Sequence, residues 1–221
     1  MLYTRVQLRA RKKKKLLQGG NFQSLIGELK KIRKDGATRL GTEALIEKLP
    51  RFFEILPRKR PAWRYFYTMC REAKRMGYSL VNIEHISAHQ LGKIFNMYDP
   101  HECYAWIKKY IKGKKWDSTK IPQQMKELEW SVDHHRTLLM LENAKKLNCN
   151  VIVMGYWHAR FSPRKKYDIR ILDNNWDKKN EPAPTFYSKY AYLIPPLLKA
   201  MPNGKLFARL KKDWPAYVNR K

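Results

Sequence analysis

The stretch NVIVMGYWHARFSPRKKYDIRILDNNW, residues 150–176, decides the fold expected for the second half of this sequence. Two segments rich in β-branched and aromatic residues, 151–161 and 167–172, flank the pentapeptide SPRKK. Serine and proline favour turns, and five connecting residues are within the range of β-hairpin loops. We therefore predict two antiparallel strands joined as a β-hairpin.

The predicted hairpin combines apolar strand faces with a cationic tip. Successive residues of a strand point to opposite faces, so Val151 and Val153 would share one face and Ile152 and Met154 the other. The tip region carries four cations and no acidic residue: Arg160, Arg164, Lys165 and Lys166. We expect these four side chains to point outward and contact RNA phosphates.

The flanks of the hairpin predict a small α/β unit over residues 122–210. Residues 122–148 carry apolar side chains at helical spacing, which indicates one long helix. Further along, residues 186–193 predict a helix, and residues 205–210, which follow an Asn-Gly turn signal, predict a third strand.

Residues 21–113 predict an α-helical array. Asn21 and Asp99-Pro100 are typical helix starts, and Gly36 and Gly77 each follow a helix end rich in lysine and arginine. Five helices are expected, over residues 21–35, 42–57, 62–76, 83–97 and 100–111, with Thr42 and Asn82 as N-caps. The 41-residue spacing of Gly36 and Gly77 suggests a repeated pair of helices.

The charge of the chain restricts its partners. The 221 residues include 47 Lys and Arg against 19 Asp and Glu, a net charge of +28. So much positive charge repels itself, which favours a polyanionic partner: nucleic acid first and an anionic membrane surface second. The sequence contains no uninterrupted stretch of 18 apolar residues, so we predict no transmembrane helix.

Both ends of the chain are basic. Residues 1–20 predict an N-terminal arm and residues 211–221 a C-terminal tail. The first 27 residues contain seven Lys or Arg and no acid, a composition typical of mitochondrial import sequences, so we expect a location on ribosomes of the mitochondrial matrix. The cations expected to bind RNA in the two segments are Arg9, Arg11, Lys12, Lys13, Lys14, Lys15, Lys211 and Lys212.

The histidines predict neither a catalytic residue nor a metal or cofactor. His85 and His89 have the i, i+4 spacing of zinc ligands, but the HExxH order is absent, and packing is the preferred interpretation. His134 and His135 point about 100° apart on a helix, so they cannot converge on one atom.

Acidic residues near the hairpin leave one enzymatic alternative open. Asp168 and Asp173, with Asp177 and Glu142, would suit a metal-dependent nuclease if their carboxylates converged. In a regular strand Asp168 and Asp173 face opposite sides, which speaks against convergence, although Asp173 also fits a turn.

Aromatic residues interleaved with cations are a second feature with two interpretations. They occur in residues 63–67, 104–110 and 114–116. Exposed rings could stack on unpaired RNA bases. The other interpretation is that Trp63, Phe66, Trp106 and Tyr110 fill helix–helix interfaces. We favour packing for the inward-facing rings.

Three cysteines, Cys70, Cys103 and Cys149, form no CxxC pair and are odd in number. They predict buried free thiols rather than a disulfide framework.

These observations predict a mostly helical α+β protein, with an N-terminal helical array followed by a small α/β unit that contains a β-hairpin. The function they favour is that of a non-enzymatic RNA-binding protein of a large ribonucleoprotein, with a mitochondrial ribosomal protein that contacts rRNA and neighbouring proteins as the preferred assignment. The alternatives are a nuclease of phage or mobile-element type and an accessory subunit of a mitochondrial membrane complex.

Overall fold

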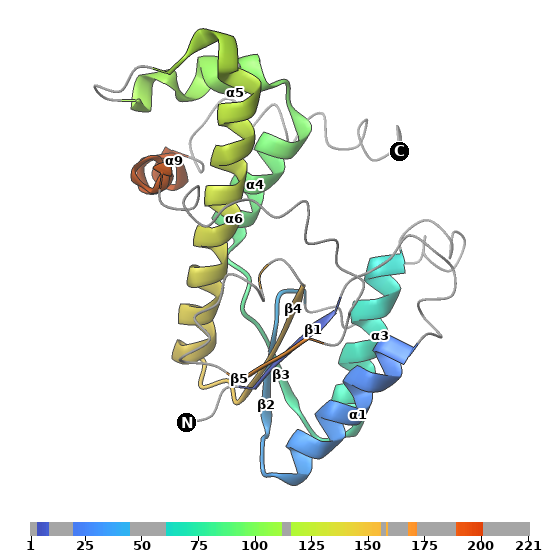
Figure 1. The fold of residues 1–221 in the computed structure, drawn as a ribbon. Helices are drawn as coiled ribbons and strands as arrows, with labels where there is room; N and C mark the ends of the chain where they lie inside the picture. Colours follow the sequence, from blue (N-terminus) through green and yellow to red (C-terminus); the bar gives the residue numbers. More distant parts are fainter. Residues whose placement is uncertain are drawn as a thin grey trace. The chain divides into compact units, whose positions relative to one another are not determined.

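The computed structural model describes residues 4–8, 20–44, 61–111, 116–155, 158, 168–171 and 189–200 (Figure 1). The fold combines α and β structure and is mostly helical, as the sequence predicts. The strands are β1 (Thr4–Leu8), β2 (Arg39–Thr42), β3 (Ser79–Asn82), β4 (Val151–Gly155) and β5 (Asp168–Ile171). The helices are α1 (Gly20–Lys34), α3 (Pro61–Arg75), α4 (Ile86–Met97), α5 (Pro100–Ile107), α6 (Ile121–Lys146) and α9 (Ile194–Ala200).

The chain divides into two compact units. Unit 1 comprises Met1–Glu84 and Thr137–Lys178, and unit 2 comprises His85–Arg136 and Lys179–Lys221. This division differs from the expected one, because unit 2 begins within the predicted helical array and interrupts unit 1.

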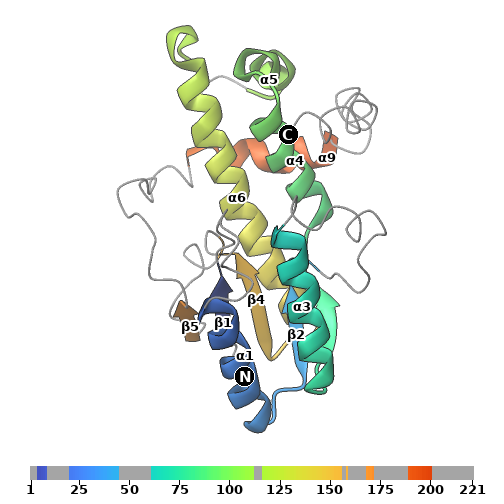
Figure 2. The ribbon, with the colours of Figure 1, turned by 90° about the vertical axis from the view of Figure 1, so that its right-hand side faces the viewer.

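Unit 1 is built on a parallel sheet with the strand order β3-β2-β4-β1-β5 (Figure 2). In the register of the central strands, Val151 of β4 lies between Leu40 of β2 and Thr4 of β1. Helices α1 and α3 cover one face of the sheet, and the end of α6 packs on the other.

The predicted β-hairpin is wrong. Strand β1 lies between β4 and β5 and is parallel to both, so these two strands are neither adjacent nor antiparallel. The predicted alternation within β4 is confirmed: Val151 and Val153 pack with α1 and α3, whereas Ile152 and Met154 pack with α6. A strand that is buried on both faces has a continuous apolar sequence, which is typical of parallel sheets.

Two further expectations for the first half of the chain are corrected. Residues 4–8 form strand β1 inside the sheet, so the segment 1–20 is not solely a basic arm. Residues 21–113 are not a purely helical array, because they supply β2 and β3. Thr42 and Asn82, expected as helix N-caps, are the last residues of these strands and lie opposite each other.

The regular spacing of Gly36 and Gly77 comes from two successive helix–strand units rather than from pairs of helices. Both glycines have left-handed backbones, with φ of 93° and 82°, which a residue without Cβ adopts at little cost. The N–H groups of Ala37 and Tyr78 donate to the carbonyls five residues earlier, which closes the ends of α1 and α3 in Schellman fashion. Each strand then begins two or three residues after its glycine.

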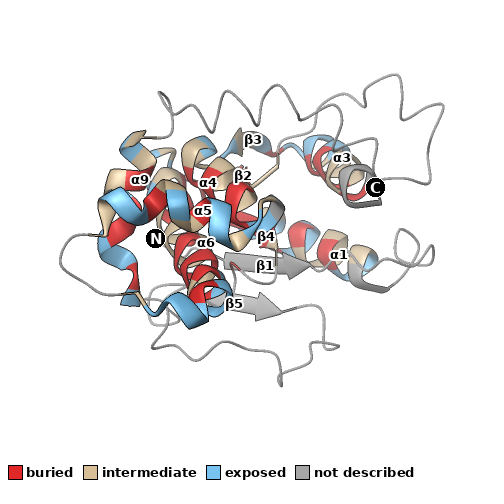
Figure 3. Ribbon diagram, turned by 90° about the horizontal axis from the view of Figure 1, so that it is seen from above, coloured by how far each residue is buried: buried red, intermediate tan, exposed pale blue. Residues whose placement is uncertain are grey.

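Unit 2 has its own hydrophobic core, formed by α4, α5, the first half of α6, the 3-10 helix η5 (Ala191–Leu193) and α9. Figure 3 shows the buried positions of these helices. Its fully buried members include Leu91, Ile94, Ile107, Leu128, Leu193 and Leu197.

The prediction of buried free cysteines is confirmed for Cys70, Cys103 and Cys149. Burial raises the pKa of the Cys149 thiol to about 11 and that of Cys103 to about 12. Both thiols are therefore protonated at neutral pH and poor nucleophiles.

Two buried tyrosines on the α1–α3 side of the sheet give a matched test of the packing in unit 1. The Tyr78 hydroxyl donates to the Leu29 carbonyl at 2.7 Å, whereas the buried Tyr65 hydroxyl has no hydrogen-bond partner among the described residues. We expect Tyr78→Phe to lower the free energy of unfolding by about 1 kcal/mol, and Tyr65→Phe to leave it unchanged or raise it by about 1 kcal/mol. Urea unfolding of both variants checks this, and equal losses would contradict it.

Tyr78 also predicts a pH dependence. Burial raises its pKa to about 12, so the folded state holds the phenolic proton more tightly than the unfolded state. Its contribution to stability is complete below the unfolded pKa of about 10 and is lost as the pH rises towards 12. The Tyr78→Phe variant should therefore lose less stability than the wild type over this alkaline range.

Candidate nucleic-acid interface

The cations predicted to bind RNA lie outside the described residues. This holds for Arg9, Arg11, Lys12, Lys13, Lys14, Lys15, Arg160, Arg164, Lys165, Lys166, Lys211 and Lys212. These assignments stay predictions.

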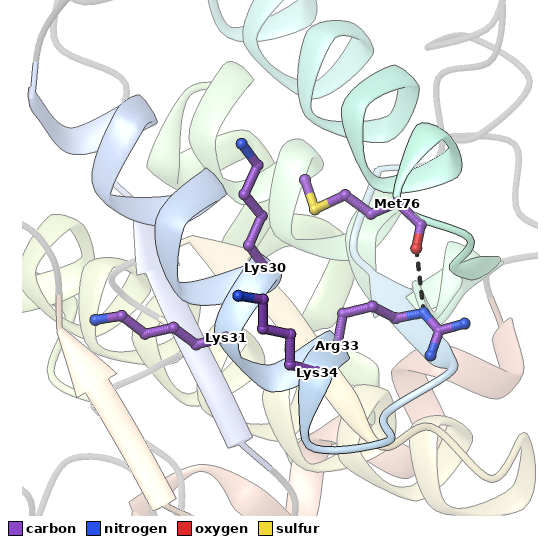
Figure 4. A pocket seen from close by; sticks show the side chains of 5 residues that line it. All are labelled: Lys30, Lys31, Arg33, Lys34 and Met76. Carbon is purple, nitrogen blue, oxygen red and sulfur yellow. Dashed lines mark hydrogen bonds between the residues drawn. The ribbon is translucent and has the colours of Figure 1, made fainter.

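A different group of cations is placed by the structure, at the end of α1. Lys30, Lys31, Arg33 and Lys34, with Met76 from the end of α3, line a shallow hollow of about 290 Å³ (Figure 4). We call these five residues the α1 basic surface. In the sequence alone, these four cations fit two interpretations equally well, a phosphate-binding site or an ordinary solvated helix face.

Arg33 is held in place by the residues that end α3. Its Nε donates to the Met76 carbonyl at 3.1 Å, and its guanidinium carbon lies 6.0 Å from the centre of the Tyr78 ring. A Cβ on Gly77 would approach Arg33 Nη2 to 3.3 Å, so the glycine leaves room for this arrangement. Arg33 thus joins α1 to α3 as well as adding charge.

The lysines of the α1 basic surface differ in how far they are engaged. Lys31 Nζ lies 3.1 Å from Glu28 Oε1, an exposed pair that contributes little stability. Lys30 and Lys34 are exposed, stand one helical turn apart and extend from α1 in Figure 4 without an ion pair to any described residue. These two ammonium groups are the ones that can approach an anion.

The position of these cations also has a local structural cause. Lys31, Arg33 and Lys34 occupy the last turn of α1, where positive charge interacts favourably with the partial negative charge of the helix end. Helix stability therefore explains cations at this end. It does not require the exposed Lys30, which adds a further cation to the same hollow.

A second polar group lies where β2 and β4 end. Glu43 follows β2, and its Oε1 accepts a hydrogen bond of 2.9 Å from the Gly155 N–H. Glu43 Oε2 lies 3.6 Å from Nε2 of the buried His158, whose Nδ1 lies 2.7 Å from Thr137 Oγ1 on α6. We call Glu43, Thr137 and His158 the carboxyl-edge cluster, because parallel sheets commonly bind ligands beyond the carboxyl ends of their strands.

The geometry of the carboxyl-edge cluster is that of a polar bridge between elements. Both ring nitrogens of His158 face protein groups, and Thr137 is fully buried. A Cβ on Gly155 would come within 3.1 Å of Glu43 Oε1, so the carboxylate lies tightly against β4. The cluster therefore joins β2, β4 and α6, and its Glu–His pair is an acid–base pair at the edge where ligands bind in such sheets.

The acids that suggested a nuclease do not gather in the described structure. Asp168 is the first residue of β5 and pairs with Thr4, at the opposite end of the sheet from Glu43. Glu142 is exposed on α6, and Asp173 and Asp177 lie outside the described residues. No three His, Cys, Asp or Glu side chains within the described ranges are arranged to hold a metal ion.

The positions of His85, His134 and His135 are explained by helix capping and packing. His85 is the N-cap of α4, and its Nδ1 accepts a hydrogen bond from the Ala88 N–H at 3.3 Å. His134 and His135 are half-buried on α6, and burial, followed by the charge of His135, lowers the pKa of His134.

Comparison with protein-family models, with curated proteins and with solved structures finds no match to this chain. Of the helices that the structure describes, none has both the length and the apolar character needed to cross a membrane.

Proposed function

We propose that this protein binds nucleic acid through phosphate contacts, as an RNA-binding component of a large ribonucleoprotein. A mitochondrial ribosome is the assembly that its acid-free N-terminal segment favours, with rRNA and neighbouring proteins as partners. The observation that carries the proposal is the α1 basic surface on a chain with a net charge of +28.

The chemistry of the α1 basic surface suits a phosphate backbone rather than base edges. Its lining has four cations and no aromatic ring, amide or carboxylate. Lysine and arginine bound to phosphates displace condensed counterions, which gives affinity without sequence readout. Lys30 and Lys34 would each contact one phosphate, and the fixed Arg33 would add a third positive charge.

The double variant Lys30→Gln/Lys34→Gln tests this function. Loss of two phosphate contacts should lower the slope of log K against log salt by about 1.4 for a single strand or about 1.8 for a duplex. If the affinities converge near 1 M salt, a slope change of about 1.4 corresponds to about 25-fold weaker binding at 0.1 M. The measurement is a titration of labelled RNA by fluorescence anisotropy at several salt concentrations.

Lys145→Gln/Lys146→Gln is the matched control. These two lysines are also exposed, occupy the last turn of α6 and belong to unit 1. The control removes the same charge from a comparable helix end, so it should change the slope much less. Equal effects of the two double variants would show diffuse attraction and contradict a site on α1, and salt-independent binding would contradict the function itself.

Cleavage of the RNA during these titrations would favour the nuclease alternative. Within the described residues, the observation that favours a nuclease is the Glu43–His158 pair, not Asp168. Nothing in the described residues favours the membrane-complex alternative over RNA binding.

A further inference from the structure

Unit 2 presents a surface of a different kind, on which aromatic rings lie beside lysines, at the junction of α5 and the short 3-10 helix η2 (Lys108–Tyr110). Trp106 and Tyr110 are half-buried, and their ring centres lie 6.4 Å apart at an interplanar angle of 75°. Lys108 and Lys109 are exposed beside them. We call these four residues the aromatic–lysine surface.

The rings of this surface are held by the core beneath them. The ring centre of Trp106 lies 6.4 Å from that of the buried Phe95. Both Trp106 and Tyr110 pack against the core of unit 2. A ring that is already fixed loses little conformational entropy when a flat ligand stacks on it, which favours binding. The partial exposure of the two rings leaves area for such a ligand.

A second aromatic group in unit 2 shows how rings used for packing are arranged there. The Trp116 ring centre lies 5.5 Å from that of Tyr104 and 5.2 Å from that of the buried Tyr190, so two other rings contact Trp116. Among the described residues, Tyr110 instead has Trp106 as its one ring neighbour, in an edge-to-face arrangement, and the Lys109 ammonium group lies 5.1 Å from the Tyr110 ring centre. A cation–π contact of this kind is weak at an exposed site and can give way to another ring.

The charge around the aromatic–lysine surface indicates which kind of ligand would supply a ring to stack on Tyr110. Residues 103–116 contain five lysines and no acid. Acids flank this segment on both sides and serve helix starts: Asp99 and Glu102 lie before and in the first turn of α5, and Asp117 caps the 3-10 helix Ser118–Lys120. Rings bordered by lysines match an anionic chain that carries flat bases.

We propose that the aromatic–lysine surface binds unpaired nucleotides, with a base stacked on Tyr110 and the flanking phosphate held by Lys108 and Lys109. This inference rests on the proposed nucleic-acid binding and adds its substrate class: single-stranded rather than fully paired RNA. In a duplex the bases are stacked on each other, so only unpaired bases are open to stacking on protein rings.

Tyr110→Leu tests the stacking, with Tyr110→Phe as its conservative partner. Leucine keeps apolar volume but removes the ring, and phenylalanine keeps the ring and removes the hydroxyl. We expect Tyr110→Leu to weaken binding of a single-stranded oligouridylate about 5- to 150-fold, the equivalent of one stacked base at about 1–3 kcal/mol. Tyr110→Phe should retain wild-type affinity, and the affinity of both variants for an RNA duplex should be unchanged.

Two further variants keep the test decisive. Lys109→Gln, at an exposed position, should lower the salt slope for oligouridylate by about 0.7 without affecting folding. Tyr192→Leu removes another exposed ring of unit 2 and should leave binding unchanged.

The outcomes separate this inference from the proposed function. Unchanged oligouridylate binding by both Tyr110→Leu and Lys109→Gln overturns the inference, as does an equal loss of duplex and single-strand affinity in Tyr110→Leu. In either case, a wild-type protein that binds RNA and loses affinity in Lys30→Gln/Lys34→Gln leaves the proposed function standing. A wild-type protein that binds neither RNA overturns both.

Discussion

Replacing Gly41 by alanine should lower the free energy of unfolding by about 1–3 kcal/mol, the usual cost of overpacking a closed core. Gly41 is in the middle of β2, between β3 and β4. An added Cβ would lie 2.7 Å from Ile83 Cγ2 and 2.9 Å from Cys149 Sγ. Both neighbours are fully buried, so neither can move aside without disturbing its own packing.

Gly27→Ala is the matched control, because it makes the same chemical change without a clash. Nothing lies within 4 Å of a Cβ built on Gly27, which is inside α1. Alanine is favoured over glycine in a helix interior, so this variant should gain about 0.5–1 kcal/mol. Urea unfolding followed by circular dichroism measures both, and a Gly41→Ala variant as stable as the wild type would show that the sheet is not packed as described.

The sequence predicted α1, α3, α5 and α6 well, because their start and stop signals are local. Asp99 before Pro100 starts α5 as expected, and its carboxylate accepts from the N–H groups of His101 and Glu102. Gly36 and Gly77 end α1 and α3 as expected, since left-handed backbone at these positions is a property of single residues.

The sheet could not be predicted in the same way because its pairing joins distant segments. β2 and β3 are RLGT and SLVN, four residues each, with too little apolar alternation to identify a strand. β4, which pairs with β2, begins more than 100 residues after β2 ends. β1 lies in a segment whose positive charge predicts an arm rather than a strand. The continuous apolar run 151–154 was the available signal for a central parallel strand.

The candidate sites divide in the same way. Lys30 and Lys34 were visible in the sequence, but only the structure shows that they share a hollow with the restrained Arg33. The carboxyl-edge cluster was missed, because Glu43, Thr137 and His158 are remote in sequence and meet only once β2 and β4 are neighbours.

Glu127→Ala should be the second strongly destabilising change, with an expected loss of about 2–3 kcal/mol in the free energy of unfolding. The Glu127 side chain is only 5% exposed in unit 2 and accepts three hydrogen bonds. Lys189 Nζ donates at 2.6 Å, the Tyr190 hydroxyl at 3.1 Å and Gln123 Nε2 at 3.2 Å. Alanine would leave the buried Tyr190 hydroxyl without its acceptor, and hydrogen bonds to a charged group contribute about 1.5–3 kcal/mol.

Glu142→Ala is the control on the same helix, because Glu142 is exposed and such changes alter stability by less than about 0.5 kcal/mol. Thermal and urea unfolding of both variants give the comparison. Equal stability of the two variants would mean that the carboxylate of Glu127 does not join α6 to the segment at Lys189.

The pH dependence of the stability lost in Glu127→Ala shows whether lost hydrogen bonds or a cavity cause that loss. The hydrogen bond to Glu127 is the largest contribution that raises the pKa of Lys189, and burial raises that of Tyr190. Both folded pKa values exceed the unfolded ones, so this stabilisation is complete below about pH 10 and is lost as the pH rises through the folded pKa values. The deficit of Glu127→Ala should therefore shrink in alkaline solution, because the wild type loses there what the variant already lacks. A deficit that stays constant with pH would instead be the cost of the cavity left by the removed side chain, with no contribution from the charged hydrogen bonds.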